Sequence, residues 1–459
     1  MIEFIRHQFA TKSIVLLGFG REGQSSYSLL RRAFPEKPLT IADANKDVGE
    51  NPLIKEDKNL RLLAGPDYLD RLIDFDVIFR SPGIPVWNLD LPREKITSQT
   101  ELFLQCYSKQ VIGITGTKGK STTSSLIHHI FRTAGLDALL AGNIGNPVFH
   151  FTDLITEKTR IVLELSSHQL EFIRVSPHIA VLLNLFQEHL DAYAGYEEYQ
   201  QAKVNITKYQ QPGDYLIFSK EDALVSRHVI QYESMRHSIP FSMEQTLSPG
   251  GYMQDGWICF SDGMQVTKVW KVHQDRFLRG EHNLRNIMAA VNVSMISGIH
   301  PEMIEEGIAT FKGLDHRLEY VGEFGKIHFY NDSIATIPEA CMAAVKAIPK
   351  VDTLITGGFD RGIDYNELAG FLNQSKVRNL ILLGDAGKRI GELLRKMDNN
   401  GKKIFFINRF DDFLPIAFRE TREGYVCLLS PAAASYDEFK NFEERGKRFR
   451  ELVKNEVKN

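Results

Sequence analysis

Short runs of apolar residues alternate with longer stretches of helical periodicity over most of the chain. Short runs are typical of buried strands, and the longer stretches are typical of helices packed on a sheet. The predicted strands lie at residues 14–17, 39–42, 77–79, 111–114, 161–165, 179–185, 327–330, 353–355, 380–383, 404–407 and 426–429. Strands that alternate with helices indicate an α/β fold with parallel sheets.

Breaks in this pattern predict three domains. The two prolines of Ser81-Pro82-Gly83-Ile84-Pro85 disfavour regular structure and close the first unit. Asp255-Gly256 lies between two apolar runs, which predicts a hairpin and an antiparallel patch on the second domain. Because 459 residues are too many for one ordinary core, we expect domains at residues 1–98, 99–312 and 313–459.

Composition and charge exclude several classes of protein. A formal net charge of -3 gives no basic surface for nucleic acid or membrane binding. The four cysteines are scattered, which argues against a disulfide framework or a zinc knuckle and fits a reducing compartment. No apolar run is long enough to span a bilayer, and the N-terminus lacks the pattern of a signal peptide. We expect a cytoplasmic protein, and nothing in the sequence requires more than a monomer.

A first glycine-rich loop follows the strand at 14–17. Gly18, Gly20 and Gly23 precede a helical stretch, and Asp43 ends the next strand. Glycines at this spacing let the backbone approach a pyrophosphate at a helix N-terminus, and the acid reaches a ribose or base. The pattern predicts binding of a nucleotide diphosphate, either NAD or a uridine diphosphate sugar. A bare tight turn is the alternative.

A second loop, Gly116-Thr117-Lys118-Gly119-Lys120-Ser121-Thr122, follows the strand at 111–114 and opens a predicted helix. Backbone N–H groups of such a loop cradle phosphates, the lysine reaches the β- and γ-phosphates, and the following hydroxyl binds magnesium. Ile114 stands where the common loop has its first glycine, so this is a variant loop. We assign Lys120 to the phosphates and Ser121 to the metal.

These loops and several later motifs resemble the muramyl (Mur) ligase family. The further motifs are Gly142-Asn143-Ile144-Gly145, Glu164-Leu165-Ser166-Ser167-His168-Gln169-Leu170-Glu171, Ser430-Pro431-Ala432-Ala433-Ala434-Ser435 and Phe439-Lys440-Asn441-Phe442-Glu443-Glu444-Arg445-Gly446. Their order and spacing are most similar to those of the members that add glutamate to UDP-N-acetylmuramoyl-L-alanine in peptidoglycan synthesis.

The resemblance implies a Rossmann-like N-terminal domain for the UDP part, a central P-loop ATPase-type domain and a C-terminal Rossmann-like α/β domain for the amino acid. It implies that ATP phosphorylates a carboxylate and that the amino group attacks the acyl phosphate, which releases phosphate. ATP and two Mg²⁺ sites are the implied cofactors. Domain closure would bring the reactants together.

The resemblance also assigns metal ligands, catalytic residues and residues of the substrate sites. Glu164, His189 and a carbamylated Lys203 are implied metal ligands, with Lys120, His189, Lys203 and Arg317 as catalytic residues. Composition alone would make Lys203 a solvated surface lysine. Ser81, Gly83, Asn143 and His189 join the first glycine loop in the implied UDP-substrate site, and Asn283 and Asn286 are implied to contact adenine.

In the third domain the resemblance places Arg317 and Asp332 at ATP. The implied amino-acid site consists of Thr336, Arg361, Ser435, Tyr436 and Phe442. The family reads Asn-Asp-Ser-Lys-Ala-Thr where this chain has Asn331-Asp332-Ser333-Ile334-Ala335-Thr336. Loss of that cation leaves open whether D-glutamate, the usual substrate, or L-glutamate is used.

Three other functions compete with this interpretation. A nicotinamide dehydrogenase explains the first loop but not the second. A non-catalytic ATP switch explains the second loop but gives no reason for Glu164, His189 and Lys203. A ligase for a folate or another wall precursor shares the central loop, whereas residues 430–446 favour glutamate addition.

Overall fold

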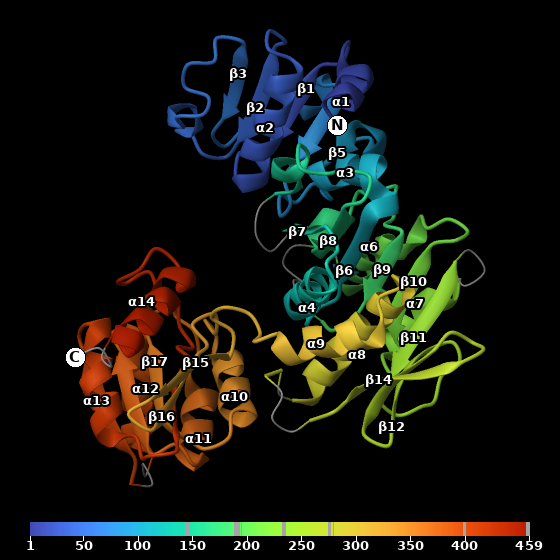
Figure 1. Cartoon of the computed structure of the whole chain (residues 1–459). Helices are drawn as coiled ribbons and strands as arrows, with labels where there is room; N and C mark the ends of the chain where they lie inside the picture. Colours follow the sequence, from blue (N-terminus) through green and yellow to red (C-terminus); the bar gives the residue numbers. More distant parts are fainter. Residues whose placement is uncertain are drawn as a thin grey trace. The chain divides into compact units, whose positions relative to one another are not determined.

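The computed structural model describes residues 1–142, 147–187, 193, 195–231, 236–273, 277–278, 280–397 and 401–455. Within these residues the strands form three sheets of five, nine and six strands (Figure 1). The chain divides into two compact units: residues 1–273 with 281–310, and residues 274–280 with 311–459.

The first sheet is parallel throughout, with strand order β3-β2-β1-β4-β5. Its elements are α1 (Ile2–Phe9), β1 (Ile14–Leu17), α2 (Arg21–Ala33), β2 (Leu39–Asp43), β3 (Leu60–Ala64), β4 (Val77–Arg80), β5 (Ile96–Thr97) and α3 (Gln99–Tyr107). The strands predicted at 14–17, 39–42 and 77–79 are confirmed. The sequence pattern does not predict β3 or β5, because β3 is an edge strand without a buried residue and β5 has two residues.

The second sheet has nine strands in the order β14-β13-β12-β11-β10-β9-β6-β8-β7. Its strands are β6 (Val111–Thr115), β7 (Ala138–Gly142), β8 (Arg160–Glu164), β9 (Ile179–Leu182), β10 (Tyr215–Ser219), β11 (His237–Ser242), β12 (Gly250–Gln254), β13 (Trp257–Ser261) and β14 (Val266–Lys271). The predicted hairpin is confirmed, since β12 and β13 pair antiparallel around Asp255 and Gly256, whose φ angles are 51° and 76°.

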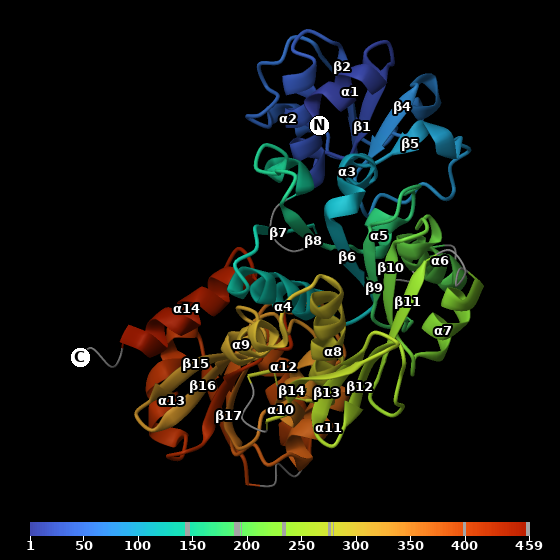
Figure 2. The same ribbon diagram turned by 45° about the vertical axis from the view of Figure 1, so that its right-hand side comes forward.

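Six helices accompany this sheet: α4 (Lys120–Thr133), α5 (Ser167–Leu170), α6 (Tyr196–Lys208), α7 (Ala223–Val229), α8 (Glu281–Ile296) and α9 (Pro301–Thr310). Helix α4 packs against α8 and α9 (Figure 2). One apolar core contains Leu16 of β1, Phe103 of α3 and Leu163 of β8, so the first two sheets share it. The domain boundary at residue 98 therefore stays a prediction, because contacts do not separate residues 1–98 from the rest of this unit.

The third sheet has the order β15-β16-β20-β17-β18-β19, with only its edge strand β15 antiparallel. Its elements are β15 (Glu319–Phe324), β16 (Ile327–Asn331), α10 (Pro338–Ala347), β17 (Val351–Gly357), α11 (Asn366–Gln374), β18 (Asn379–Leu383), α12 (Gly384–Lys396), β19 (Lys403–Ile407), α13 (Phe413–Glu420), β20 (Val426–Leu429) and α14 (Phe442–Asn455). All five strands predicted in this region are confirmed, and β15 is additional.

Successive residues of the third sheet point to opposite faces, and each face has its own core. Leu380 and Leu382 of β18 belong to a cluster with α10, α11 and α12. Ile381 and Leu383 belong to a second cluster with α13 and α14. A strand buried on both sides reads as a continuous apolar run, which is why the sequence predicts β18 so clearly.

All four cysteines are free thiols. Among the described residues, no helix is both long enough and apolar enough to cross a bilayer.

Candidate active site

The first glycine loop joins β1 to α2. Gly18 has a φ of 87°, and a Cβ on Gly23 would lie 2.1 Å from the carbonyl oxygen of Gly18, so larger residues would strain both positions. Ser81 Oγ donates a hydrogen bond of 2.9 Å to Gly18 O. Asp43 Oδ2 accepts one of 2.7 Å from Phe19 N. Four of the predicted UDP-site residues thus lie together beyond the carboxyl ends of β1, β2 and β4.

Asp43 shapes this loop with both of its carboxylate oxygens, since Oδ1 accepts a hydrogen bond of 2.8 Å from Asn45 N. Gly20 is the N-cap of α2. Gly83 has a φ of 84° with open space around its Cα. The loop is therefore a built turn at a helix N-terminus, and contact of Asp43 with a ribose or base stays a prediction.

The phosphate loop joins β6 to α4 and is closed by its own backbone. Gly116 and Gly119 have φ angles of 150° and 87°, which favour glycine. Lys120 Nζ donates hydrogen bonds of 2.9 Å to Gly116 O and 3.0 Å to Thr117 O. Because Lys120 also begins α4, its ammonium group and the N–H groups of the first helical turn belong to one short segment, as an anion site requires.

Residues distant in sequence fix the position of this loop. Asn184, just beyond β9, accepts a hydrogen bond of 2.8 Å from Lys118 N and donates one of 3.0 Å to Lys118 O. Thr117 Oγ1 lies 3.0 Å from Tyr199 OH. A Cβ on Gly119 would lie 2.4 Å from Asn286 Oδ1, so the predicted adenine segment on α8 lies against the loop.

A carboxylate and a lysine are buried at the same loop. Ser121 Oγ donates a hydrogen bond of 3.3 Å to Glu164 Oε1, and Glu164 is fully buried at the end of β8. Lys203 is 2% exposed and donates a hydrogen bond of 3.0 Å to Gly116 O. Its burial contradicts the expectation, drawn from composition alone, of a solvated surface lysine.

The oxygens of Ser121 and Glu164 suit a hard divalent cation. The part of the chain that the structure describes contains no group of three or more His, Cys, Asp or Glu side chains that could hold a metal by themselves. A magnesium ion here would therefore also need oxygens from water and phosphate, as is usual for Mg²⁺ at nucleotides.

In the second unit, Asp332 lies directly after β16 and is 4% exposed. It accepts hydrogen bonds of 3.1 Å from Leu318 N and 2.8 Å from Ser430 Oγ, which follows β20. Burial raises the pKa of Asp332 to about 7, with these hydrogen bonds acting in the opposite direction. The carboxyl ends of β16 and β20 thus meet around a carboxyl group that titrates near neutrality.

Four of the predicted amino-acid residues lie on loops of this unit, and the fifth, Phe442, begins α14. Arg361 Nη2 donates a hydrogen bond of 2.8 Å to Thr336 O. Ser435 is buried, whereas Tyr436 is 64% exposed with its ring 6.1 Å from that of Phe359. Phe442 O accepts a hydrogen bond of 2.8 Å from Ser333 Oγ.

Comparisons with known proteins identify the family of this chain. Residues 114–294 match the model of the Mur ligase middle domain. The chain is 35% identical over 455 residues to the UDP-N-acetylmuramoylalanine--D-glutamate ligase of Clostridium kluyveri. The matched residues cover 96% of each of the two chains. The chain belongs to the Mur ligase family. The fold agrees: MurF from Acinetobacter baumannii aligns with a TM-score of 0.61 at 15% identity over 96% of this chain and 93% of that one. MurF ligase from Thermotoga maritima in complex with ADP aligns with a TM-score of 0.55 at 16% identity, over 96% of this chain and 95% of that one.

In this Mur ligase the structure brings the predicted central residues together at one loop: Gly116, Lys120, Ser121, Glu164 and Lys203. Two predicted residues, Asn143 and His189, lie outside the described residues. Arg317 and Asp332 belong to the second unit with the predicted amino-acid residues. The roles assigned to all these residues stay predictions.

The sequence of this Mur ligase did not lead to a predicted role for Arg445, whose side chain is 1% exposed. Its Nε donates a hydrogen bond of 3.0 Å to Ser333 Oγ, and its Nη2 donates one of 2.9 Å to Ser333 O. Its Nη1 donates hydrogen bonds of 3.2 Å to the carbonyl oxygens of Ala433 and Ala434. The sequence does contain a sign that this arginine is buried. On α14 it is spaced four residues from Phe449, which is four residues from Val453, so Arg445 lies on the apolar face of the helix.

A cavity of about 410 Å³ in the second unit is lined in part by Leu318, which bonds to Asp332, but by none of the predicted site residues themselves. Its lining includes Lys350, which precedes β17, and Gly424, which precedes β20. It therefore lies toward the amino ends of these strands, whereas Asp332 and Ser430 follow the carboxyl ends. Ligands of parallel sheets bind at the carboxyl ends, so this cavity is not part of the candidate site.

Proposed function

We propose that the chain ligates D-glutamate to UDP-N-acetylmuramoyl-L-alanine with ATP, forming ADP and phosphate in peptidoglycan precursor synthesis. The observation that carries this proposal is the meeting of Lys120, Ser121, Glu164 and Lys203 at one phosphate loop. The similarity to a D-glutamate ligase over nearly the whole chain supports the substrates.

Lys120 and the first turn of α4 bind the ATP phosphates in this proposal. Lys120 exchanges its bonds to Gly116 O and Thr117 O for phosphate oxygens. Ser121 and Glu164 hold magnesium, which when bound neutralises charge on the phosphates. Asn283 and Asn286 contact the adenine.

Lys203 carries a carbamate in this proposal. Carbamylation requires a neutral amine, and the Lys203 side chain is buried at the phosphate loop. The modification turns a cation into an anion that helps hold the second magnesium, together with His189.

The first glycine loop, with Asp43, Ser81 and Gly83, binds the uridine diphosphate, and Asn143 contacts the muramoyl group. In the first step an oxygen of the L-alanyl carboxylate bonds to the γ-phosphorus as the bond to ADP breaks. Arg317 contacts the phosphates there because a guanidinium fork suits phosphoryl charge, and Asp332 completes the ATP site.

The amino acid binds at Thr336, Arg361, Ser435, Tyr436 and Phe442. Arg361 holds its side-chain carboxylate, which it can bind through two N–H groups. The glutamate nitrogen then bonds to the carbonyl carbon of the acyl phosphate and gives up a proton. The tetrahedral intermediate collapses, and inorganic phosphate leaves.

Phosphate release tests this function. The wild-type protein is mixed with ATP, magnesium and UDP-N-acetylmuramoyl-L-alanine, and either D- or L-glutamate is added. We expect release with D-glutamate and none when either the UDP-substrate or glutamate is omitted. Release only with a folate acceptor would overturn the proposed acceptor, and no release under any condition would overturn the ligase function.

L-glutamate is the second candidate, and Ile334 is the observation that favours it. Ile334 stands where the family has a lysine, which removes a cation near the incoming carboxylates. If only L-glutamate supports release, Ile334→Lys is the variant to test for a return of D-glutamate use.

A further inference from the structure

Arg317 lies in a loop whose backbone is held in an uncommon conformation. His316 and Leu318, on either side of it, have φ angles of 62° and 45°. Such angles are disfavoured for residues with side chains and persist only where the surroundings enforce them. Arg317 Nε is buried and has no hydrogen-bond partner among the described residues. Something other than the side chain of Arg317 must therefore fix this loop.

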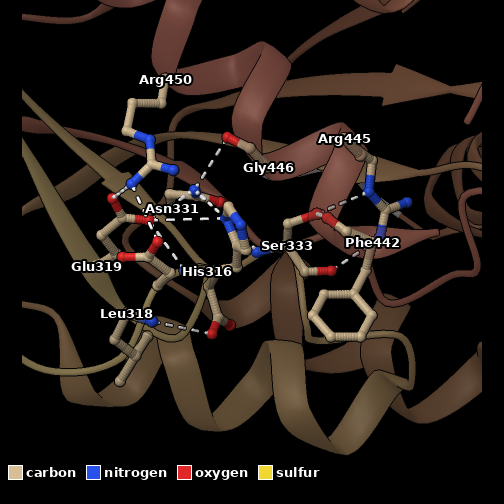
Figure 3. Close-up of polar contacts among 11 residues, drawn as sticks. His316, Leu318, Glu319, Asn331, Ser333, Phe442, Arg445, Gly446 and Arg450 are labelled. Carbon is tan, nitrogen blue, oxygen red and sulfur yellow. Dashed lines mark hydrogen bonds and ion pairs between the residues drawn. The ribbon is translucent and has the colours of Figure 1, made fainter. Parts of the chain in front are cut away.

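Glu319 supplies much of that fixation (Figure 3). Its Oε2 accepts hydrogen bonds of 2.9 Å from His316 N and 2.9 Å from Asn331 Nδ2. Asn331 Nδ2 also lies 2.9 Å from His316 Nδ1. Burial lowers the pKa of His316, which favours the neutral ring. The carboxylate thus holds both the backbone of His316 and the amide that meets its ring.

Helix α14 holds Glu319 from the other side. Arg450 Nη1 donates a hydrogen bond of 2.8 Å to Glu319 Oε1. Gly446 O accepts one of 3.1 Å from Asn331 Nδ2. The fit is close, because a Cβ on Gly446 would lie 2.2 Å from His316 Nδ1.

The backbone on the far side of Arg317 is held as well. Leu318 N donates to Asp332 Oδ1 at 3.1 Å, and Ile334 N donates to His316 O at 3.1 Å. Both neighbours of Arg317 are therefore bound through their backbones, while Arg317 Nε has no hydrogen-bond partner among the described residues.

We propose that Glu319, supported by Arg450, is a positioning residue that presents Arg317 to the phosphates of ATP. The inference rests on the proposed function, in which Arg317 contacts those phosphates. Glu319 acts through the backbone of residues 316–318 and does not touch ATP. The last helix of the chain thereby takes part in catalysis through Gly446 and Arg450.

A double-mutant cycle tests this positioning role. Glu319→Ala should lower kcat for phosphate release about tenfold in the wild-type background, because small misplacements of a catalytic group are costly, and should leave the KM for glutamate unchanged. In an Arg317→Ala background the same change should alter kcat by less than about twofold. A general structural defect would lower kcat by the same factor in both backgrounds and would overturn the proposal.

Further variants separate positioning from stability. Gly446→Ala displaces His316 without removing a charge and should also lower kcat, whereas Arg450→Lys should retain more activity than Arg450→Ala. Glu423→Ala is the matched control, since its ion pair with Lys326 is exposed in the same unit and should not affect kcat. If Glu319→Ala does not fold, Glu319→Gln takes its place in the cycle. Inactive wild-type protein overturns the proposed function itself, whereas active wild-type with unaffected Glu319 variants overturns this inference alone.

Discussion

The phosphate loop of the first unit and the loop after β16 in the second unit are built in different ways. In the first, the residues from Gly116 to Thr122 are consecutive, and Lys120 bonds to carbonyls three and four positions before it. In the second, Asn331 bonds to Gly446 across 115 residues, and Arg445 bonds to Ser333 across 112. A local loop carries its chemistry in a short motif, whereas a site assembled across the chain depends on contacts that no motif contains.

The largest expected effect concerns the local loop. Lys120→Ala removes the only side-chain cation that the proposal gives to the ATP phosphates from within the loop. We expect kcat for phosphate release to fall about a thousandfold, in the range found for the loss of a main electrostatic contact in a transition state. Steady-state phosphate release with saturating ATP measures this.

Lys158→Ala is the control for charge alone, because Lys158 is exposed in the same unit. It should leave phosphate release unchanged. Equal activity of the Lys120 and Lys158 variants would remove the phosphate loop from the mechanism and would break the contrast between the two regions.

The sequence predicts what depends on neighbours along the chain. The strand–loop–helix from Val111 to Thr133 and the hairpin at Asp255-Gly256 need only apolar runs and particular backbone angles, so both are predicted. Strand β15 is not predicted, because it is an edge strand of half-exposed residues whose pattern is set by pairing with β16.

The candidate site likewise contains residues that the local sequence predicts and residues that it does not. The burial of Lys203 was expected only from the family resemblance, since α6 surrounds it with residues of mixed polarity. Neither Arg445 nor Glu319 was predicted, because each owes its role to a strand or helix more than ten residues away in sequence. Burial of a charged side chain depends on tertiary packing, and its periodicity on a helix is the only local sign of it.

The second expected effect concerns the site assembled across the chain. Arg445→Met leaves Ser333 O and Ala433 O without the hydrogen bonds that Arg445 donates. Leaving buried carbonyls unpaired should lower the free energy of unfolding by about 3 kcal/mol. Urea unfolding of the full chain, followed by far-ultraviolet circular dichroism, measures the loss.

Arg448→Met is the matched control on the same helix, since the ion pair of Arg448 with Asp411 is partly exposed. It should cost less than about 1 kcal/mol. Arg445→Lys should fall between the two, because an ammonium group cannot reproduce the guanidinium fork. Similar losses in the Arg445 and Arg448 variants would mean that the buried contacts do not hold the second region together.

The smallest effect is a pH dependence that each unit should show through one carboxyl group with a raised pKa. Burial raises the pKa of Asp332 to about 7 in the second unit and that of Glu22 to about 7 in the first. A raised carboxyl pKa means that the folded state binds more protons than the unfolded state. The stability contribution is therefore present below about pH 4 and is lost as the pH rises through about 7.

Asp332→Asn and Glu22→Gln isolate these two contributions, because each amide stays neutral at every pH. The unfolding free energy of the wild type minus that of Asp332→Asn should decrease by about 2 kcal/mol from pH 4 to pH 8. Each unit by which the pKa is raised equals about 1.4 kcal/mol, and relaxation of the protein around the charge reduces the full value. Glu22→Gln should behave similarly, although Glu22 lies on α2 after the first glycine loop and accepts a hydrogen bond of 2.7 Å from Gln169. A difference that does not change with pH for Asp332 but does for Glu22 would show that only the first unit keeps this carboxyl group away from water.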